Sequence, residues 1–336
     1  MKAKLLLEAL SFALLVVAVV FLPHHVSDFH SRELATVGMY FIALVGLGIL
    51  TGYSGQISLG HGAFMAIGGY TTAILEVNHG VRDIWTIPIA GLVAGAAGLL
   101  VGIPALRLSG PYLALVTLGI AIAFPQLPKK YGHFTGGTTG EILNLPKAPF
   151  GLHTTPNHWL YYLTWAIALM LLVCAWVLLR TKPGRTWQAV RDSETAAAAS
   201  GIGVPAYKTL AFGISAFYAG IAGSLFAIAT SFVNPDTYPI VLSIFLVVGL
   251  AVGGASSLAG LLAGAAFVYY LDNHADAVAR WADHLPFVSV NPQQSGIPSV
   301  AFGAVLILVV LLLPTGVGGL LHRLLRPLTS RLYSRS

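Results

Sequence analysis

The sequence is short of charge and of cysteine. Only 9% of its 336 residues are charged and the mean hydropathy is +0.80, which excludes a soluble fold with a charged surface. The single cysteine, Cys174, lies in an apolar run, so no disulfide can form within the chain. The chain has instead a series of apolar runs near the ~20 residues that cross a bilayer as helix. They predict an all-α, polytopic helical membrane protein, with residues 1–336 as a single domain.

Signatures of catalysis and of cofactor binding are also missing. No phosphate-binding loop of the form GxxxxGK[ST] occurs, so any ATP and Mg²⁺ that the protein needs must bind to another polypeptide. His24, His25 and His30 cluster near Asp28, but no zinc-ligand spacing accompanies them, so we expect no metal site. No catalytic pair stands out, so we expect no enzymatic activity. The net charge of +6 falls in loops between apolar runs and gives no support to nucleic-acid binding.

Windows without charged residues locate the spans. Two of them, residues 34–75 and 237–271, are too long for one helix and tight for two, and each is interrupted in its middle by glycines. Counting each as two crossings gives about ten spans. The two broken windows follow their preceding spans in the same order and direction, which predicts a parallel internal repeat. The windows of ordinary length are residues 9–27, 84–106, 108–128, 159–179, 209–235 and 297–321.

The two glycine-rich breaks are candidates for the lining of a path through the membrane. Unwound backbone is tolerated at membrane depth only where it lines a cavity or is buried in protein, and paired breaks mark the path in transporters. The alternative is close helix packing, which needs glycine for steric reasons alone. The predicted path residues are Tyr53, Gln56, Ser58, Gly60, His61, Gly253, Gly254, Ser256 and Ser257.

The distribution of lysine and arginine predicts the orientation. With ten spans, 12 of the 18 basic residues fall on one side, which is assigned to the cytoplasm together with both termini. Residues 129–158 then form an external loop. A Gly/Thr cluster in this loop is predicted to gate the outer mouth or to contact an external protein, and a flexible turn is the alternative. The cluster consists of Thr135, Gly136, Gly137 and Thr138.

One long charge-rich passage, residues 181–208, lies on the cytoplasmic side. Its alanine run favours helix, and Gly201 is expected to end that helix before Pro205. Arg191 and Glu194 lie three residues apart, close enough to pair on one helical face. A polar helix held between two spans is suited to contact a partner outside the membrane. The alternative is a solvated loop that only connects two spans.

Two longer motifs carry a family resemblance. GYSGQISLGHGAF occupies residues 52–64, and GRTWQAVRDSETAAAASGI occupies residues 184–202. Both resemble the LivM-type permease of branched-chain amino acid ABC importers. Weaker matches are LRLSGPY at 106–112, FTGGTTG at 134–140 and GGASSLAG at 253–260. The matches extend over about residues 40–320; they are specific in combination, although the glycine-rich ones are not specific singly.

The resemblance implies a subunit of an importer in the bacterial inner membrane. The implied partners are a second, LivH-type permease, two ATPase subunits that bind ATP and Mg²⁺, an external substrate-binding protein and membrane lipid. In such importers a cytoplasmic helix of the permease docks on an ATPase. Glu194 lies seven residues before Gly201, whereas the general importer motif has six, so the main contact stays open. The implied ATPase-coupling residues are Arg185, Arg191, Glu194, Ala197 and Gly201.

The substrate and the energy source both have alternatives. The resemblance favours leucine, isoleucine and valine, but related permeases carry urea or short-chain amides. An ion-coupled secondary transporter or a channel would normally carry an ionisable residue within a span, and His61 is the only titratable candidate at depth. An ATP-driven permease is therefore the favoured interpretation.

Overall fold

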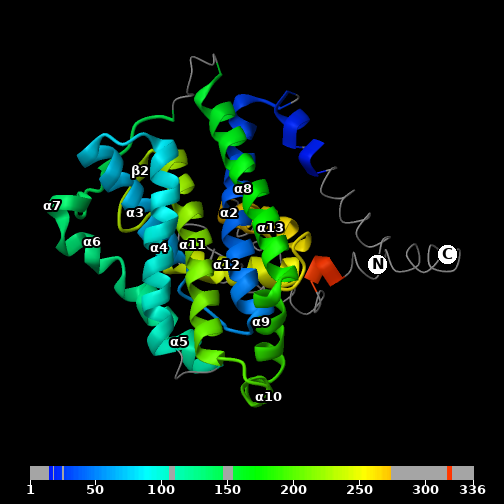
Figure 1. The fold of residues 1–336 in the computed structure, drawn as a ribbon. Coiled ribbons are helices and arrows are strands. Elements are labelled where there is room, and N and C mark those ends of the chain that lie inside the picture. Colours follow the sequence, from blue (N-terminus) through cyan, green and yellow to red (C-terminus); the bar gives the residue numbers. More distant parts are fainter. Residues whose placement is uncertain are drawn as a thin grey trace, which may run out of the picture.

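The computed structural model describes residues 15–17, 19–24, 26–105, 110–146, 154–273 and 316–319. These residues form an α-helical bundle with one small pair of strands (Figure 1), which confirms the predicted helical class. Five described helices are long and apolar enough to cross a membrane. They are Asp28–Tyr53, Asp83–Ile103, Tyr112–Lys130, Pro156–Arg180 and Val204–Thr230.

The first broken window folds as two helices with an irregular segment between them. Helix α2 (Asp28–Leu47) runs directly into the π-helix η2 (Gly48–Tyr53), and α3 (His61–His79) begins after residues 54–60. The hydrogen bonding between residues five apart, which defines a π-helix, continues at the end of η2, where Ser54 N donates to Ile49 O at 3.1 Å. A π-turn inside a helix is rare and often occurs at functional sites. The interruption falls within the glycine-rich motif at residues 52–64.

The second broken window forms a hairpin of two short helices, α12 (Ile240–Gly253) and α13 (Gly260–Asn273). Gly253 packs against Gly260, and Gly249 packs against Gly264, so the two helices are antiparallel and nearly in backbone contact. Each has 14 residues, or about 21 Å at 1.5 Å per residue, which is less than the ~30 Å of hydrocarbon. Over the residues that the structure describes, neither helix is long enough by itself to cross the membrane.

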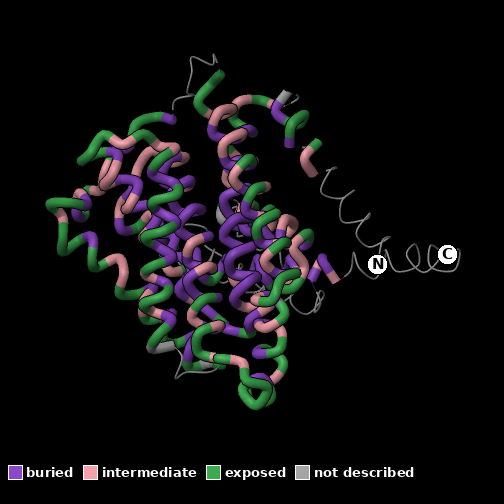
Figure 2. Tube along the Cα trace, viewed as in Figure 1, coloured by how far each residue is buried: buried purple, intermediate pink, exposed green. Residues whose placement is uncertain are grey.

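Helix α11 (Val204–Thr230) lies at the centre of the bundle. It packs against α4 (Asp83–Ala105), α3 and α2, and buried residues concentrate along α2 and α11 (Figure 2). The backbones of α3 and α11 touch where Gly68 faces Gly220 and where Gly223 faces the Met65 carbonyl group. A Cβ atom at these glycines would overlap backbone atoms of the neighbouring helix, so small residues set this close packing.

Helix α8 (Pro156–Arg180) packs along α2 and leads into the 181–208 loop. The Trp165 indole donates a hydrogen bond to the Leu34 carbonyl oxygen at 3.1 Å, and the ring stacks against Phe41. The loop carries α9 (Lys182–Asp192) and α10 (Glu194–Ala199), which lie at the end of the bundle opposite strand β2 (Figure 1).

Short elements cover the other end of the bundle. After α5 (Pro111–Ala123) come α6 (Gln126–Lys130) and α7 (Gly132–Thr135), and η1 (Leu22–His24) precedes α2. Strand β1 (Glu141–Ile142) pairs antiparallel with β2 (Phe232–Val233), so that Glu141 lies opposite Val233. The two strands thereby connect the segment after α7 to the end of α11 through backbone hydrogen bonds.

The predicted count of ten spans and the parallel repeat are not confirmed by the residues that the structure describes. The predicted span at 297–321 lies almost wholly outside them, as do both chain ends. The predicted span at 9–27 and the predicted loop at 129–158 are described in part, with residues 147–153 of the loop left out. The single domain 1–336 and the loop boundaries stay predictions.

Candidate functional site

The 181–208 loop folds as two helices that meet at Ser193. The Ser193 hydroxyl accepts a hydrogen bond from Ala196 N at 3.2 Å and caps α10, because serine at this position satisfies a free N–H group of the first turn. The expected pairing of Arg191 with Glu194 is wrong, since the break at Ser193 separates their helical faces. Arg191 lies 3.2 Å from the Asp192 carboxylate, and Glu194 pairs with Lys208.

Helix α9 is anchored in the bundle through Trp187. The Trp187 side chain is fully buried, and its indole N–H donates to the Tyr207 carbonyl oxygen at 2.8 Å. Gly184 packs on the backbone around Leu179, where a Cβ atom would overlap. Arg185 is exposed on the opposite side of the helix. The loop is therefore anchored to the bundle on one side and exposed on the other, unlike a fully solvated connection.

Arg191 contacts the first helix break directly. Its Nη1 atom donates a hydrogen bond to the Gly52 carbonyl oxygen at 2.7 Å, within the π-helix. Gly55, at φ +75°, lies under the same side chain, and a Cβ atom there would be 2.8 Å from Arg191 Cγ. A guanidinium bound to a backbone carbonyl makes a charge-assisted hydrogen bond, which is stronger than a neutral one. The loop is thus joined to the segment where α2 unwinds.

A second connection runs from Glu194 through Lys208 to the same break. Lys208 Nζ lies 2.5 Å from Glu194 Oε1, and the Lys208 side chain is only 7% exposed. The carbonyl oxygen of Lys208 accepts a hydrogen bond from Gln56 Nε2 at 3.2 Å, and the same amide donates to Ser54 Oγ. Glu194 therefore compensates a buried charge of its own chain, while half of its side chain stays exposed.

The exposed face of α10 is small and polar. Glu194, Ala198 and Ala199 are exposed, and Gly201 lies in the left-handed region at φ +81°, where a Cβ atom would meet no other atom within 4 Å. Gly201 ends the helix as expected, since glycine adopts this conformation without steric cost. Ala197 is 4% exposed and packs inward. The implied contact of Ala197 with an ATPase does not fit this burial.

The two glycine breaks meet in the structure. Gly52 packs against the Ala255 carbonyl group, and the Tyr53 hydroxyl donates to the Ser256 carbonyl oxygen at 2.8 Å. Gly253 lies against Gly260, where a Cβ atom would be 2.7 Å from the Gly260 carbonyl oxygen. The structure therefore brings both halves of the predicted path to one place. Of the small residues around the second break, Ser256 is exposed and Gly254 and Ser257 are partly buried.

The polar residues after the first break are turned into the bundle. His61 is 1% exposed, and its Nε2 atom lies 2.9 Å from the Ala43 carbonyl oxygen. The buried Ser58 hydroxyl accepts a hydrogen bond from Gly60 N at 3.3 Å, and a Cβ atom at Gly60 would lie 2.7 Å from the Thr117 carbonyl oxygen. With Gln56 also buried, these contacts fit the packing alternative in this conformation. Their place in a path stays a prediction.

The Gly/Thr cluster forms an ordered turn after α7. The Thr135 hydroxyl is buried and donates to the Pro128 carbonyl oxygen at 2.8 Å. Gly136 and Gly137 have φ angles of +70° and +61°, which glycine adopts readily, and Thr138 is exposed at the tip. Thr138 is therefore the one exposed residue of this cluster, and its contact with an external protein stays a prediction. The gating role stays a prediction.

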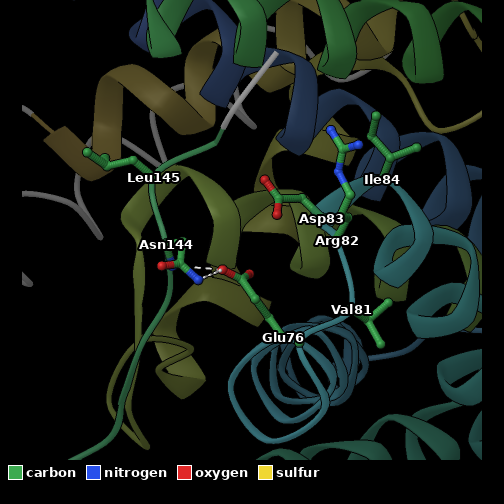
Figure 3. A pocket seen from close by; sticks show the side chains of 8 residues that line it. Glu76, Val81, Arg82, Asp83, Ile84, Asn144 and Leu145 are labelled. Atoms are coloured by element: carbon green, nitrogen blue, oxygen red, sulfur yellow. Dashed lines mark hydrogen bonds between the residues drawn. The ribbon is translucent and has the colours of Figure 1, made fainter. Parts of the chain in front are cut away.

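The sequence did not reveal the burial and ion pair of Lys208, nor a cavity at the end of α3 that lies away from the first helix break. Lys208 stands at the edge of an apolar run, which gives no sign of its burial or its partner. The cavity has a volume of about 430 Å³ and is lined by Glu76, Asp83 and Asn144 among others (Figure 3). Its components come from three segments that the fold brings together.

The apolar helices, the anchored loop and the paired breaks together define a helical membrane protein with a polar, partly exposed loop at one end. The chain belongs to the family described as "Branched-chain amino acid transport system / permease component", whose model matches residues 31–314.

Several curated proteins are similar to the chain. The high-affinity branched-chain amino acid transport system permease protein LivM of Salmonella typhimurium (strain LT2) is 38% identical over 272 residues, and LivM of Escherichia coli (strain K12) is 39% identical. Each alignment covers 73% of this chain but 63% of the relative. The autoinducer 2 import system permease protein LsrC of Enterobacter sp. (strain 638) is 28% identical over 70% of both chains. No solved structure matches the chain significantly.

Proposed function

We propose that the chain is a transmembrane permease subunit of an ATP-driven importer for branched-chain or related hydrophobic amino acids. The substrate would be delivered by an external binding protein. The LivM relatives at 38% and 39% identity support this substrate class over urea or short-chain amides. ATP and Mg²⁺ would bind to separate ATPase subunits, and this chain would perform no chemistry of its own.

The observation that carries the proposal is the hydrogen bond from Arg191 to the Gly52 carbonyl oxygen. A loop that only connects two spans has no need of a buried tryptophan anchor and of a charged contact to a helix break. A loop that receives force from an ATPase needs both, because movement of its exposed face must reach the membrane segments. Arg191 and the Glu194–Lys208 pair supply two such connections.

The mechanism that follows is a two-state movement of the first break. The π-helix holds more residues per turn than an α-helix, so a shift of its hydrogen bonds rotates the residues beyond it. Since Gly52 and Tyr53 pack on Ala255 and Ser256, such a rotation would displace the second break as well. Docked ATPase subunits would drive the shift through Arg191.

An importer subunit of this kind would have a defined orientation in the membrane and a defined set of partners. Residues 181–208 and both termini would lie in the cytoplasm of a bacterium, with the chain in the inner membrane. The partners would be a LivH-type second permease, two ATPase subunits and a binding protein that contacts Thr138. An ion-coupled transporter remains the competing class.

Uptake in proteoliposomes tests the proposal. The chain is reconstituted with its permease partner, the ATPase pair and the binding protein, and labelled leucine is supplied outside. We expect uptake that requires ATP on the ATPase side and that persists when a protonophore collapses the proton gradient. Uptake driven by the proton gradient in the absence of ATPase subunits would overturn it. Uptake of urea in preference to leucine would be consistent with an ATP-driven importer but would show that the proposed substrate is wrong.

A further inference from the structure

The cavity at the end of α3 contains a buried carboxylate with an unused oxygen. Glu76 is 6% exposed, and its Oε1 atom accepts hydrogen bonds from Asn144 N at 2.7 Å and from Asn144 Nδ2 at 3.0 Å (Figure 3). Its Oε2 atom is buried and has no hydrogen-bond partner among the residues that the structure describes. A buried carboxylate oxygen without a partner costs free energy, because it has lost its hydrogen bonds to water and no protein group replaces them.

The contact with Asn144 does not by itself require an acid at this position. A glutamine carbonyl oxygen would accept the same two hydrogen bonds and would avoid the cost of a buried charge. Asp83, at the first turn of α4, lines the same cavity and adds a second negative charge that acts on Glu76. Two carboxylates against the single guanidinium of Arg82 leave the cavity with an excess of negative charge, which favours a cation.

The rim and walls of the cavity add two further features. Arg82 is exposed on the rim, where a guanidinium can bind a carboxylate. Val81, Ile84 and Leu145 supply apolar surface, and Leu145 is 64% exposed, so the cavity can be reached from outside the bundle. The turn that presents Arg82 is fixed, since Gly80 ends α3 at φ +63° and its N–H group donates to the Glu76 carbonyl oxygen at 3.0 Å.

We propose that this cavity binds an α-amino acid with a small apolar side chain through its ammonium group. The ammonium group donates to Glu76 Oε2, the carboxylate of the ligand lies toward Arg82, and the side chain packs on Ile84 and Leu145. The ammonium ion is the group that satisfies the unpaired oxygen and offsets the repulsion between Glu76 and Asp83. The identity of the ligand as an amino acid rests on the proposed function. In the proposed orientation the site faces the external side, where the substrate enters.

Binding to the full permease–ATPase complex in nanodiscs, without the binding protein, tests the site. The probes are leucine, isoamylamine, which keeps the ammonium group, and isocaproate, which keeps the carboxylate. We expect the wild-type complex to bind leucine and isoamylamine, and not isocaproate. Glu76→Gln should weaken both by about tenfold or more, since it removes the charge and retains the contacts with Asn144.

Asn144→Ala is the matched control, because it removes the side-chain hydrogen bond to Oε1 and leaves the charge of Glu76. We expect it to change the affinity for leucine by less than about threefold, within the range of indirect effects. Equal binding by wild type and Glu76→Gln would overturn the site, as would loss of binding in Asn144→Ala alone. ATP-driven leucine uptake without binding at this cavity would refute the site and leave the proposed function. Binding of isoamylamine by a complex that transports no leucine would support ammonium recognition and refute the proposed substrate.

Discussion

Arg191 in α9 and Gly52 in the π-helix, 139 residues apart in the chain, are joined by a hydrogen bond of 2.7 Å from the guanidinium to the backbone carbonyl oxygen. Side-chain donors that bind backbone carbonyl groups within a helix compete with the helix's own hydrogen bonds. This contact therefore stabilises the unwound form of the helix end. Because Gly52 also packs on Ala255, one side chain of the loop is linked to both helix breaks.

Substitution of Gly201 tests whether the exposed face of α10 docks on an ATPase. Gly201→Trp places a large ring in open space at the end of α10 and should reduce binding-protein-stimulated ATP hydrolysis by about tenfold or more, because it obstructs close approach. Gly201→Ala is the control, since any residue other than glycine at φ +81° carries the same backbone strain of about 1 kcal/mol. The assay is ATPase activity of the reconstituted complex. Equal stimulation in the tryptophan and alanine variants would show that this face is free.

The contact between the two breaks predicts a steric effect at Gly52. A Cβ atom there overlaps the Ala255 carbonyl group, so Gly52→Ala should separate the breaks and lower the free energy of unfolding by about 1–3 kcal/mol. Gly119→Ala in α5 is the control, because it meets no atom within 4 Å. Thermal unfolding of the purified chain in detergent measures both. Similar midpoints for the two variants would contradict the observed packing.

The ion pair between Glu194 and Lys208 predicts that substitutions at the two positions have non-additive effects on the free energy of unfolding. Glu194→Gln leaves the buried Lys208 ammonium group without its carboxylate, and we expect a loss of about 1–2 kcal/mol, moderated by the exposure of Glu194. Lys208→Met removes the buried charge, and after it the change at Glu194 should have little effect. Unfolding midpoints of the two single variants and the double variant give the interaction energy. Strict additivity would mean that the pair contributes nothing.

The substitution Gly60→Leu tests whether Gly60 is needed for helix packing or for the path of the substrate through the membrane. A Cβ atom at Gly60 would lie 2.7 Å from the Thr117 carbonyl oxygen, so we expect loss of uptake together with lowered stability. Ser58→Ala is the comparison, because it removes a polar group and fills no space. We expect it to keep the free energy of unfolding within about 1 kcal/mol of wild type. Gly60→Leu with normal stability and no uptake would instead assign Gly60 to the path.

The helical class and the sites of the helix breaks followed from the sequence, because apolar length and glycine interruption are local properties of the chain. The same holds for the end of α10 at Gly201, which depends on backbone conformation alone. The count of ten crossings stays a prediction. Window length cannot distinguish two full spans from a hairpin such as α12 and α13, whose glycines let two short helices pack closely.

The side-chain contacts of the candidate site were less accessible to sequence reasoning. Arg191 and Glu194 are three residues apart, which favoured a pair on one helix, but the cap at Ser193 ended that helix before Glu194. The contacts of Glu194 with Lys208 and of Arg191 with Gly52 form only through tertiary packing. The Glu76 cavity brings the segment after β1 against the end of α3, the turn after it and the start of α4, and no sequence spacing predicts this proximity.

Coupling between the loop and the membrane segments is measured as the number of leucine molecules transported per ATP hydrolysed in proteoliposomes. Arg191→Gln loses the charge-assisted hydrogen bond to Gly52, whereas Lys182→Gln loses the same charge at the exposed start of α9. We expect Arg191→Gln to lower the ratio by about fivefold or more, as a lost charged hydrogen bond of roughly 1.5–3 kcal/mol allows. Lys182→Gln should leave the ratio near wild type. An unchanged ratio in Arg191→Gln would contradict the account.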